Sequence, residues 1–246
     1  WDNGDFVVSG VDGEPTAPRE PIDAGNSGQV LRFVACLLGL QDQPGVITGD
    51  HSICTNRPVI PLISALPRLG VLCESINGDG FAPLKVQGPY TGQNTQLSGS
   101  DSQPVSGLIM AAVFIDQVTT ITVNNPGELP WIDLTLGWLD RFQIPYDRYQ
   151  GLYYRITGGQ GVSGFHYRVP GDLSSLSFPL VAAVLTQSSI VIHDVDRREP
   201  QGDQALIDVL ETMGACIKYN ADQLTLTVLP TERLQGIDVD INDFID

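Results

Sequence analysis

The segment DSQPVSGLIMAAVF, residues 101–114, places a short polar cap in front of an apolar run of helical length. Two other parts of the chain follow the same order, residues 26–40 and residues 172–185. Ser27, Ser102 and Ser174 mark these caps and lie 75 and 72 residues apart. Small polar side chains at such positions accept the free N–H groups of a helix N-terminus. A pattern that returns at a nearly constant spacing indicates a structural repeat.

Each repeat continues with the same series of predicted elements. First helices are expected at residues 30–40, 105–114 and 178–185, and second helices at residues 57–69, 130–142 and 201–213. Short β-branched runs predict strands at residues 45–48, 119–123 and 189–193, and closing strands follow at residues 84–86, 152–156 and 224–228. We therefore expect an α/β (α+β) fold of repeated β-α-β-α-β-β units, each of about 72 residues.

The repeat is out of phase with both ends of the chain. Residues 6–9 are similar to the closing strand of a unit, and residues 236–246 to the opening strand and cap of another. A capped repeat array would carry atypical, polar units at its ends. We therefore expect this chain to be an internal piece of a longer protein.

The balance of charge is strongly acidic, because 13 basic and 29 acidic side chains give a formal net charge of −16. This acidity excludes a broad attraction to nucleic acid or to anionic membranes. No apolar run approaches the roughly 20 residues of a membrane span, and the first residues lack the features of a signal peptide. The four cysteines are widely spaced without a C-x-x-C pair, which favours buried, reduced thiols in the cytosol over a disulfide or metal framework.

Two early segments could bind an anion at a helix N-terminus. Gly28 would let a ligand approach the backbone closely, and Arg32 lies one turn further along the same helix. The polar loop at residues 49–58 delivers Arg57, whose guanidinium suits a phosphate or a carboxylate. The simpler alternatives are a plain helix cap with a solvated Arg32 and a salt bridge between Arg57 and Asp50.

Further candidate residues lie later in the chain. Ser102 and Gln103 offer hydroxyl and amide groups to a phosphorylated ligand. Glu128 and Trp131 set a carboxylate beside an aromatic face, although a core position is the simpler explanation for Trp131. The acidic residues 238–246 alternate with apolar ones as in a strand, and a carboxylate at such a strand end could be a general base or simply solvated. Composition and spacing alone therefore reach no further than a repeat protein able to bind anions.

Together these segments resemble the sequence motifs of the enolpyruvyl transferases, in particular the branch that acts on shikimate 3-phosphate. The matching segments are NSGQVLR at residues 26–32, the Gly-Asp and Arg-Pro pairs that bound residues 49–58, SQ at residues 102–103, GDLSS at residues 171–175, QGD at residues 201–203, LETMGA at residues 210–215 and the acidic residues 238–246. The resemblance covers essentially the whole chain.

The resemblance implies the fold of that family, an inside-out α/β barrel in each of two domains, with three of these units in each. On that basis residues 1–167 would form most of one three-unit domain, whose first unit is largely missing. Residues 168–246 would form the first unit and the start of the second unit of the other domain.

The resemblance also implies a reaction. The enolpyruvyl group of phosphoenolpyruvate would be transferred to the 5-hydroxyl of shikimate 3-phosphate, a step of the shikimate pathway to aromatic amino acids and the target of glyphosate. The hydroxyl would attack C2 while C3 is protonated, and the tetrahedral intermediate would then expel phosphate. No metal and no organic cofactor is implied. The expected protein is a cytoplasmic monomer whose partners are these two small molecules, with no nucleic acid and no membrane.

Residue roles follow from the resemblance position by position. Gly28 and Arg57 would contact phosphoenolpyruvate, and Gln103 would lie between the two substrates. Ser102 would hold the phosphate of shikimate 3-phosphate. Asp246 would be the catalytic residue that accepts the proton of the 5-hydroxyl.

Three further substrate-binding positions depart from the pattern of the family. Asp101 stands where the first serine of S-S-Q is expected, and Glu128 and Trp131 stand at the serine and the tyrosine of S-x-P-Y. The two carboxylates would repel a phosphate dianion unless they are protonated or turned away. The N-terminal and C-terminal lysine and arginine motifs of the family are also absent, so this chain alone is expected to be inactive.

Two alternatives stay open. The related transferase that acts on UDP-N-acetylglucosamine should carry a reactive-cysteine loop between residues 82 and 99, where this chain has no cysteine. A non-catalytic scaffold of the same fold would also fit the loss of cations, and Asp101 and Glu128 favour it modestly.

Overall fold

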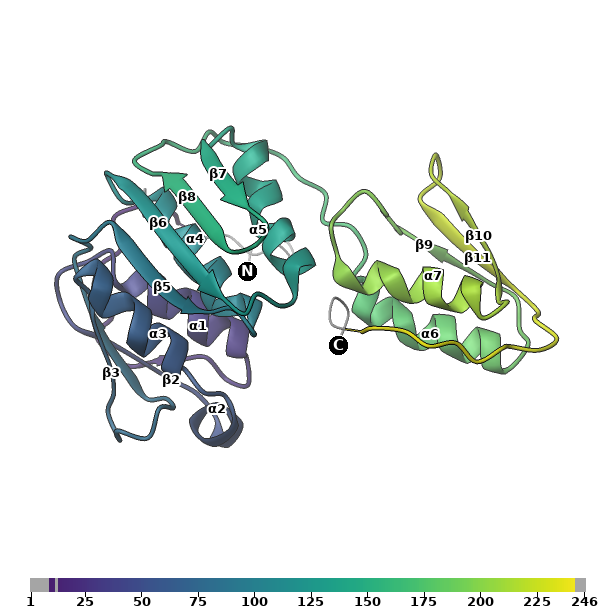
Figure 1. Cartoon of the computed structure of the whole chain (residues 1–246), viewed down its shortest axis with the longest axis horizontal. Coiled ribbons are helices and arrows are strands. Elements are labelled where there is room, and N and C mark those ends of the chain that lie inside the picture. The colour runs from purple at the N-terminus through teal and green to yellow at the C-terminus, as the bar shows by residue number, and fades with distance from the viewer. Residues whose placement is uncertain (1–8, 12, 242–246) are drawn as a thin grey trace. The chain divides into compact units, whose positions relative to one another are not determined.

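The computed structural model describes residues 9–11 and 13–241. The chain forms two compact units (Figure 1). Unit 1 comprises Trp1–Pro126 and Gln143–Gly161, and unit 2 comprises Gly127–Phe142 and Val162–Asp246. Each unit has its own strands and helices and is described here by itself.

Unit 1 contains the same order of strands twice, with one helix between the first two strands of each copy. The first copy consists of β1 (Ile22–Asp23), α1 (Gly28–Leu38), β2 (Gly45–Thr48), α2 (His51–Asn56), α3 (Ile60–Ala65), the 3₁₀ helix η1 (Leu66–Leu69), β3 (Leu72–Ser75) and β4 (Leu84–Gln87). The second copy consists of β5 (Asn94–Ser98), α4 (Ser102–Val113), β6 (Val118–Asn124), β7 (Tyr146–Tyr149) and β8 (Tyr153–Thr157).

The two sheets of unit 1 have equivalent strand orders, β1-β2-β4-β3 and β5-β6-β8-β7. In each sheet the first two strands are parallel and the other neighbours are antiparallel. A parallel pair needs a crossover connection, which α1 provides in the first copy and α4 in the second. The predicted order of the strands and of the first helix is therefore confirmed for these two copies.

In unit 1, α1 and α4 pack directly against each other (Figure 1). A Cβ atom at Gly107 of α4 would lie 3.0 Å from Sγ of Cys36 and 3.1 Å from the carbonyl oxygen of Arg32, both in α1. The absence of a side chain at Gly107 therefore allows the two helices to approach closely. Because Gly28 faces Gln103 and Arg32 faces Gly107, the helices run side by side in the same direction and their N-termini are neighbours.

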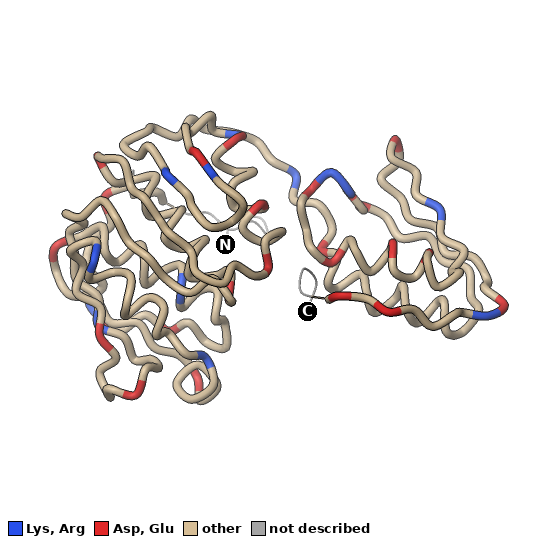
Figure 2. The backbone as a smooth tube through the Cα atoms, in the orientation of Figure 1, with Lys and Arg blue, Asp and Glu red and all other residues tan. Residues whose placement is uncertain are grey.

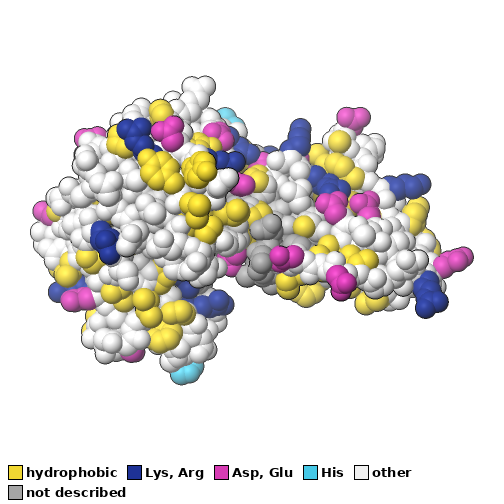
Figure 3. Space-filling view, viewed as in Figure 1, with side chains coloured by type: hydrophobic (Ala, Val, Ile, Leu, Met, Phe, Trp, Pro, Cys, Tyr) yellow, Lys and Arg dark blue, Asp and Glu magenta, His cyan; other side chains and the backbone are white. Residues whose placement is uncertain are grey.

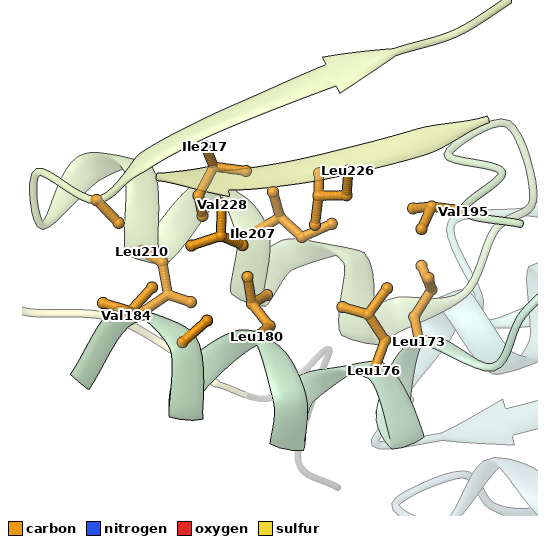
Figure 4. Close-up of a cluster of buried hydrophobic side chains, with 12 residues drawn as sticks. Leu173, Leu176, Leu180, Val184, Val195, Ile207, Leu210, Ile217, Leu226 and Val228 are labelled. Carbon is orange, nitrogen blue, oxygen red and sulfur yellow. The ribbon is translucent and has the colours of Figure 1, made fainter. Parts of the chain in front are cut away.

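Unit 2 combines helices with a three-stranded antiparallel sheet of order β10-β11-β9. Its elements are α5 (Leu129–Arg141), α6 (Leu173–Leu185), β9 (Ile190–His193), the 3₁₀ helix η2 (Gly202–Gln204), α7 (Ala205–Thr212), β10 (Cys216–Asn220) and β11 (Thr225–Leu229). Leu180 of α6, Ile207 of α7 and Leu226 of β11 belong to one cluster of buried apolar side chains, which Figure 4 shows between the helices and the sheet. Arg141 joins α5 to this unit through an ion pair with Glu199.

Residues 49–58 were predicted to be a loop, and this prediction is wrong because they contain α2. Asp50 is the N-cap of α2, and its Oδ1 accepts a hydrogen bond of 3.0 Å from the N–H of Ile53. Ile53 is the buried side chain of this helix. A six-residue helix with a single buried side chain is too short to produce a helical pattern of apolar residues.

The first helix of the third copy, predicted at residues 178–185, begins earlier, at Leu173. Asp172 caps it by accepting hydrogen bonds from the N–H groups of Ser174 and Ser175. Pro179 lies inside α6, where its missing N–H would normally interrupt a helix. The helix continues through Pro179 because Leu176 and Leu180 on either side of it are buried in the core.

The third copy also lacks the opening strand that the predicted β-α-β-α-β-β order requires. Residues 162–171 form no strand, and most of them are exposed. Their main-chain link to the sheet is at Gly171, whose N–H donates to the carbonyl of Asp194 at 2.9 Å. Residues 237–241 likewise form no strand, so the strand predicted from their alternation is absent up to the last described residue.

Charge and hydrophobicity are distributed over both units. Figure 2 shows acidic residues along both units, and Figure 3 shows hydrophobic side chains that reach the visible surface of each. Within the described part of the chain, none of the helices combines the length and the apolar character that a membrane crossing requires.

Candidate active site

Hydrogen bonds link the N-terminus of α1 to the N-terminus of α2. Ser27 caps α1 as predicted, and its hydroxyl accepts a hydrogen bond of 3.1 Å from the N–H of Val30. The side-chain amide of Asn26 donates to Oδ2 of Asp50 at 2.8 Å, and the N–H of Asp50 donates to the carbonyl of Gly25 at 2.8 Å. The two segments predicted to bind an anion are therefore held side by side.

Arg57 lies at the C-terminal end of α2 and is exposed. The alternative of a salt bridge to Asp50 is wrong, because no ion pair joins these two side chains in the described part of the chain. The carboxylate of Asp50 accepts instead from the N–H of Ile53 and the amide of Asn26. The guanidinium of Arg57 is therefore placed where a solute anion can reach it.

The N-terminus of α4 carries three of the predicted residues. Asp101 is the N-cap, and its Oδ1 accepts a hydrogen bond of 2.9 Å from the N–H of Gln103. Ser102 is buried at the first position of the helix, and Gln103 is half-buried. Both residues lie where the positive end of the helix dipole favours an anion.

Arg32 connects the N-termini of α1 and α4. Its Nη1 donates to Oε1 of Gln103 at 2.7 Å, and its Nη2 lies 2.9 Å from Oδ2 of Asp101. Nη2 also donates to the carbonyl of Pro58 at 3.2 Å, next to Arg57. Arg32 is only 4% exposed, so the alternative of a solvated arginine is wrong. The opposite charge of Asp101 compensates for the removal of this guanidinium from water.

Gly28 leaves the space in which Arg32 and Gln103 meet. A Cβ atom at position 28 would lie 2.6 Å from Nη1 of Arg32 and 3.4 Å from Oε1 of Gln103. Gly28 is itself buried as the first residue of α1. The structure thus brings Gly28, Asp101, Ser102 and Gln103 to one place in unit 1, and Arg32 links them to the carbonyl of Pro58, the residue after Arg57.

Glu128 and Trp131 lie in unit 2, at the beginning of α5. Glu128 is the N-cap residue and has the left-handed backbone angles φ 50° and ψ 40°. Such angles are uncommon for a residue other than glycine and cost on the order of 1–3 kcal/mol. Trp131 is half-buried, neither fully enclosed nor exposed.

The N-terminus of α6 shows a contact that the sequence motifs did not reveal. Gln201, from the QGD motif, accepts the N–H of Leu173 at 2.9 Å and donates to the carbonyl of Gly171 at 3.1 Å. It therefore holds the GDLSS motif in place. Asp172 in that motif accepts a hydrogen bond from the hydroxyl of Ser175, which lowers the pKa of its carboxyl group.

Asp246, the predicted proton acceptor, lies outside the described residues. Across residues 9–11 and 13–241, no three His, Cys, Asp or Glu side chains are grouped so that they could hold a metal ion.

Comparison with known families identifies one match over almost the full sequence. The family model described as EPSP synthase (3-phosphoshikimate 1-carboxyvinyltransferase) matches residues 2–246. This range includes every segment of the candidate site.

Curated proteins and solved structures agree with that match. A 3-phosphoshikimate 1-carboxyvinyltransferase of Ruminiclostridium cellulolyticum is 33% identical over 244 residues, which are 99% of this chain and 57% of that protein. The protein of the same name from Halobacterium salinarum is 39% identical over 248 residues, covering 98% of this chain and 57% of that protein. The structure of EPSP synthase from Acinetobacter baumannii superimposes with a TM-score of 0.73 at 25% identity, over 92% of this chain and 52% of that chain. This chain therefore spans little more than half the length of the proteins that it resembles.

Proposed function

The chain belongs to the EPSP synthase family, and we propose that it performs, within a protein of the length of its relatives, the transfer of an enolpyruvyl group from phosphoenolpyruvate to shikimate 3-phosphate. The observation that carries this proposal is the meeting of the N-termini of α1 and α4 at Gln103, where two helix dipoles face the same small region. Both proposed substrates are anions, and such a region stabilises negative charge.

The proposed roles follow the positions of the residues in unit 1. Gly28 and Arg57 contact phosphoenolpyruvate. Arg57 is exposed, so a solute anion can reach its guanidinium. Gln103 lies between the two substrates, and Ser102 holds the phosphate of the acceptor. The 5-hydroxyl attacks C2 of phosphoenolpyruvate, and Asp246 accepts the hydroxyl proton.

The two steps of the reaction balance without a cofactor. In the first step the new C–O bond forms at C2 while C3 gains a proton, which yields a tetrahedral intermediate. In the second step the C–O bond to phosphate breaks and C3 loses a proton, which restores the double bond. Preplaced dipoles and cations stabilise the negative charge that moves to the phosphate.

Asp101, Glu128 and Trp131 differ from the residues of the family motif, and these differences are compatible with the proposal. The carboxylate of Asp101 is directed to Arg32 and to the N–H of Gln103, and a carboxylate neutralised in this way repels a phosphate less. Glu128 and Trp131 are proposed to bind substrate at the start of α5, the positions that the family motif assigns to them.

The remaining features of the proposal concern the whole protein. It is a cytoplasmic monomer with phosphoenolpyruvate and shikimate 3-phosphate as its partners, and the four free cysteines of this chain support a reducing compartment. We propose a domain boundary between residues 167 and 168, in the exposed segment that follows the end of unit 1 at Gly161.

The test uses the whole natural protein with both substrates. We expect release of one phosphate per acceptor consumed and a product whose mass, by mass spectrometry, equals that of both substrates less phosphoric acid. UDP-N-acetylglucosamine serves as the control acceptor and should give no product. A folded protein that releases no phosphate with shikimate 3-phosphate would contradict the proposal and favour the scaffold, and turnover of the control acceptor would favour the related transferase.

The role of Asp246 is tested separately with Asp246→Asn in the same protein. We expect turnover to fall much more than the binding of either substrate, because the amide cannot accept the hydroxyl proton. An equal loss in kcat and in substrate affinity would argue against proton transfer at this position.

A further inference from the structure

Arg32 contacts each of the segments that carry the proposed residues of unit 1. It lies one turn after Gly28 on α1, it donates to Gln103 on α4, and it donates to the carbonyl of Pro58 beside Arg57. A planar guanidinium with five donors can serve several acceptors in a fixed geometry, which the ammonium group of lysine cannot do.

The hydrogen bond to Arg32 determines which way the amide of Gln103 points. A guanidinium has donors only, so the oxygen of the amide must face it. The contact of 2.7 Å between Nη1 and Oε1 therefore directs the NH₂ group of Gln103 away from Arg32. An NH₂ group presents two donors, which suit the oxygens of an anionic substrate.

Asp101 compensates for the charge of Arg32. One of its oxygens accepts the N–H of Gln103, and the other pairs with Nη2 at 2.9 Å. The side chain of Arg32 is 5% exposed, so this neutralised cation is poorly placed to bind a substrate anion directly. Its effect on a substrate has to pass through the groups that it holds.

We propose that Arg32 is a positioning residue that acts through Gln103, with Asp101 as the counter-charge that keeps it buried. This inference rests on the proposed function, because Gln103 is the group that would touch the substrates. Asp101 stands at the position of a serine in the family motif, and the inference explains why a carboxylate is there: it pairs with the buried Arg32.

The first test is a double-mutant cycle in the whole protein with Arg32→Lys and Gln103→Met. Arg32→Lys keeps the charge beside Asp101 but removes the guanidinium geometry. We expect each single variant to lower kcat/KM by roughly 10- to 100-fold, because this factor corresponds to the free energy of a hydrogen bond to a charged group. We expect the double variant to lose no more than Gln103→Met alone, because Arg32 acts through that side chain. Losses that multiply would overturn the proposal and make Arg32 a direct ligand.

The second test separates positioning from stability. Asp101→Asn keeps an N-cap on α4 but leaves the buried Arg32 without its counter-charge, so the unfolding temperature should fall. Adding Arg32→Met to Asp101→Asn should restore the unfolding temperature while kcat/KM stays low. Recovery of kcat/KM together with stability would show a purely structural role and would overturn the proposal.

The matched control is Arg197→Lys in unit 2, at an arginine that is paired with Asp208 and whose side chain is 23% exposed. It should leave kcat/KM unchanged. If the unmodified protein transfers no enolpyruvyl group, the proposed function itself fails. The cycle of Arg32→Lys and Gln103→Met is then measured by thermal unfolding, where additive effects would overturn the positioning contact as well.

Discussion

Arg57 stands at the end of α2, exposed and next to the peptide that Arg32 holds through the carbonyl of Pro58. A guanidinium in such a place can bind a carboxylate or a phosphate through two parallel hydrogen bonds. We predict that Arg57→Ala in the whole protein lowers kcat/KM for phosphoenolpyruvate by roughly 10- to 100-fold, measured by steady-state phosphate release.

Arg68 provides the control for this prediction. It is another exposed arginine of unit 1 and lies in η1. Arg68→Ala makes the same change in net charge and should leave the kinetics unchanged. Unchanged kinetics for Arg57→Ala would remove Arg57 from the site.

The buried thiols of Cys36 and Cys73 lead to a prediction about how stability depends on pH. Burial raises the pKa of Cys36 far above its usual value of 9.0, and burial raises the pKa of Cys73 to about 12. Well below pH 9 the thiols are protonated in both the folded and the unfolded chain. Above pH 9 the unfolded chain loses protons that the folded chain keeps, so the free energy of unfolding should fall by up to about 1.4 kcal/mol per pH unit for each thiol.

Urea unfolding of this chain between pH 8 and pH 10.5 measures that slope. Cys36→Ala should make the slope shallower, because one of the two thiols no longer contributes. Cys216→Ala is the control, because it removes an exposed thiol and should leave the slope unchanged. A slope that is the same in the unmodified chain and in Cys36→Ala would contradict the prediction.

At the level of the elements, α6 shows two opposite environments on one apolar helix. Leu180 is fully buried in the core of unit 2, whereas Phe178 and Leu185 are 78% and 70% exposed. Figure 4 shows Leu180 directed from α6 into the core. We predict that Leu180→Ala lowers the free energy of unfolding by about 2–5 kcal/mol, because it removes buried methyl groups and leaves a cavity.

Leu185→Ala, on the same helix, is the matched control and should change the free energy of unfolding by less than about 0.5 kcal/mol. Denaturant titration of both variants gives the comparison. Equal losses for the two leucines would mean that α6 does not lie on the sheet of unit 2 through the face that contains Leu180.

The predicted elements show how far local patterns reach. The strand predicted at residues 45–48 is β2, and the helix predicted at residues 130–142 is α5 within one residue at each end. Both rest on local signals, β-branched residues in the first and a proline near the helix start in the second. The start of α6 was misplaced and α2 was missed, because burial of Leu176 in one case and of Ile53 in the other stabilises helix that the local pattern does not indicate.

At the scale of the molecule, residues 162–171 are the described stretch that leads from Gly161 of unit 1 into α6 of unit 2. They form neither helix nor strand, and the side chain of Arg168 is 81% exposed. Proteases cleave exposed segments that can adapt to the active site of the protease. We predict that limited trypsin digestion first cuts after Arg168, as mass spectrometry of the fragments would show.

Arg168→Gln should remove that early cut without changing the unfolding temperature, since the pairing of Arg168 with Asp194 is exposed. An initial cut at an arginine within a helix or strand would contradict the prediction, because it would place the most accessible segment elsewhere.

The repeat and its family were readable from the chain without a structure. Helix caps, prolines near helix starts and runs of β-branched residues act within a few residues, and their return every 72 to 75 residues gave both the unit and the resemblance. Gly28, Arg57, Ser102 and Gln103 were named as candidate residues in this way, because each belongs to a short motif. The missing strand before α6 was not foreseen, because strand formation depends on a partner elsewhere in the sheet.

The partners of Arg32 depend instead on packing between distant segments. Its acceptor Gln103 is 71 residues away and the carbonyl of Pro58 is 26 residues away, and the choice between a solvated and a buried arginine was open in the sequence. The close approach of α1 and α4 at Gly107 brings Arg32 of α1 beside α4, where its guanidinium pairs with Asp101. Local chemistry determines which groups a helix N-terminus offers. Which of those groups pair with each other depends on the energy of burying a charge, and the packing of the whole unit sets that energy.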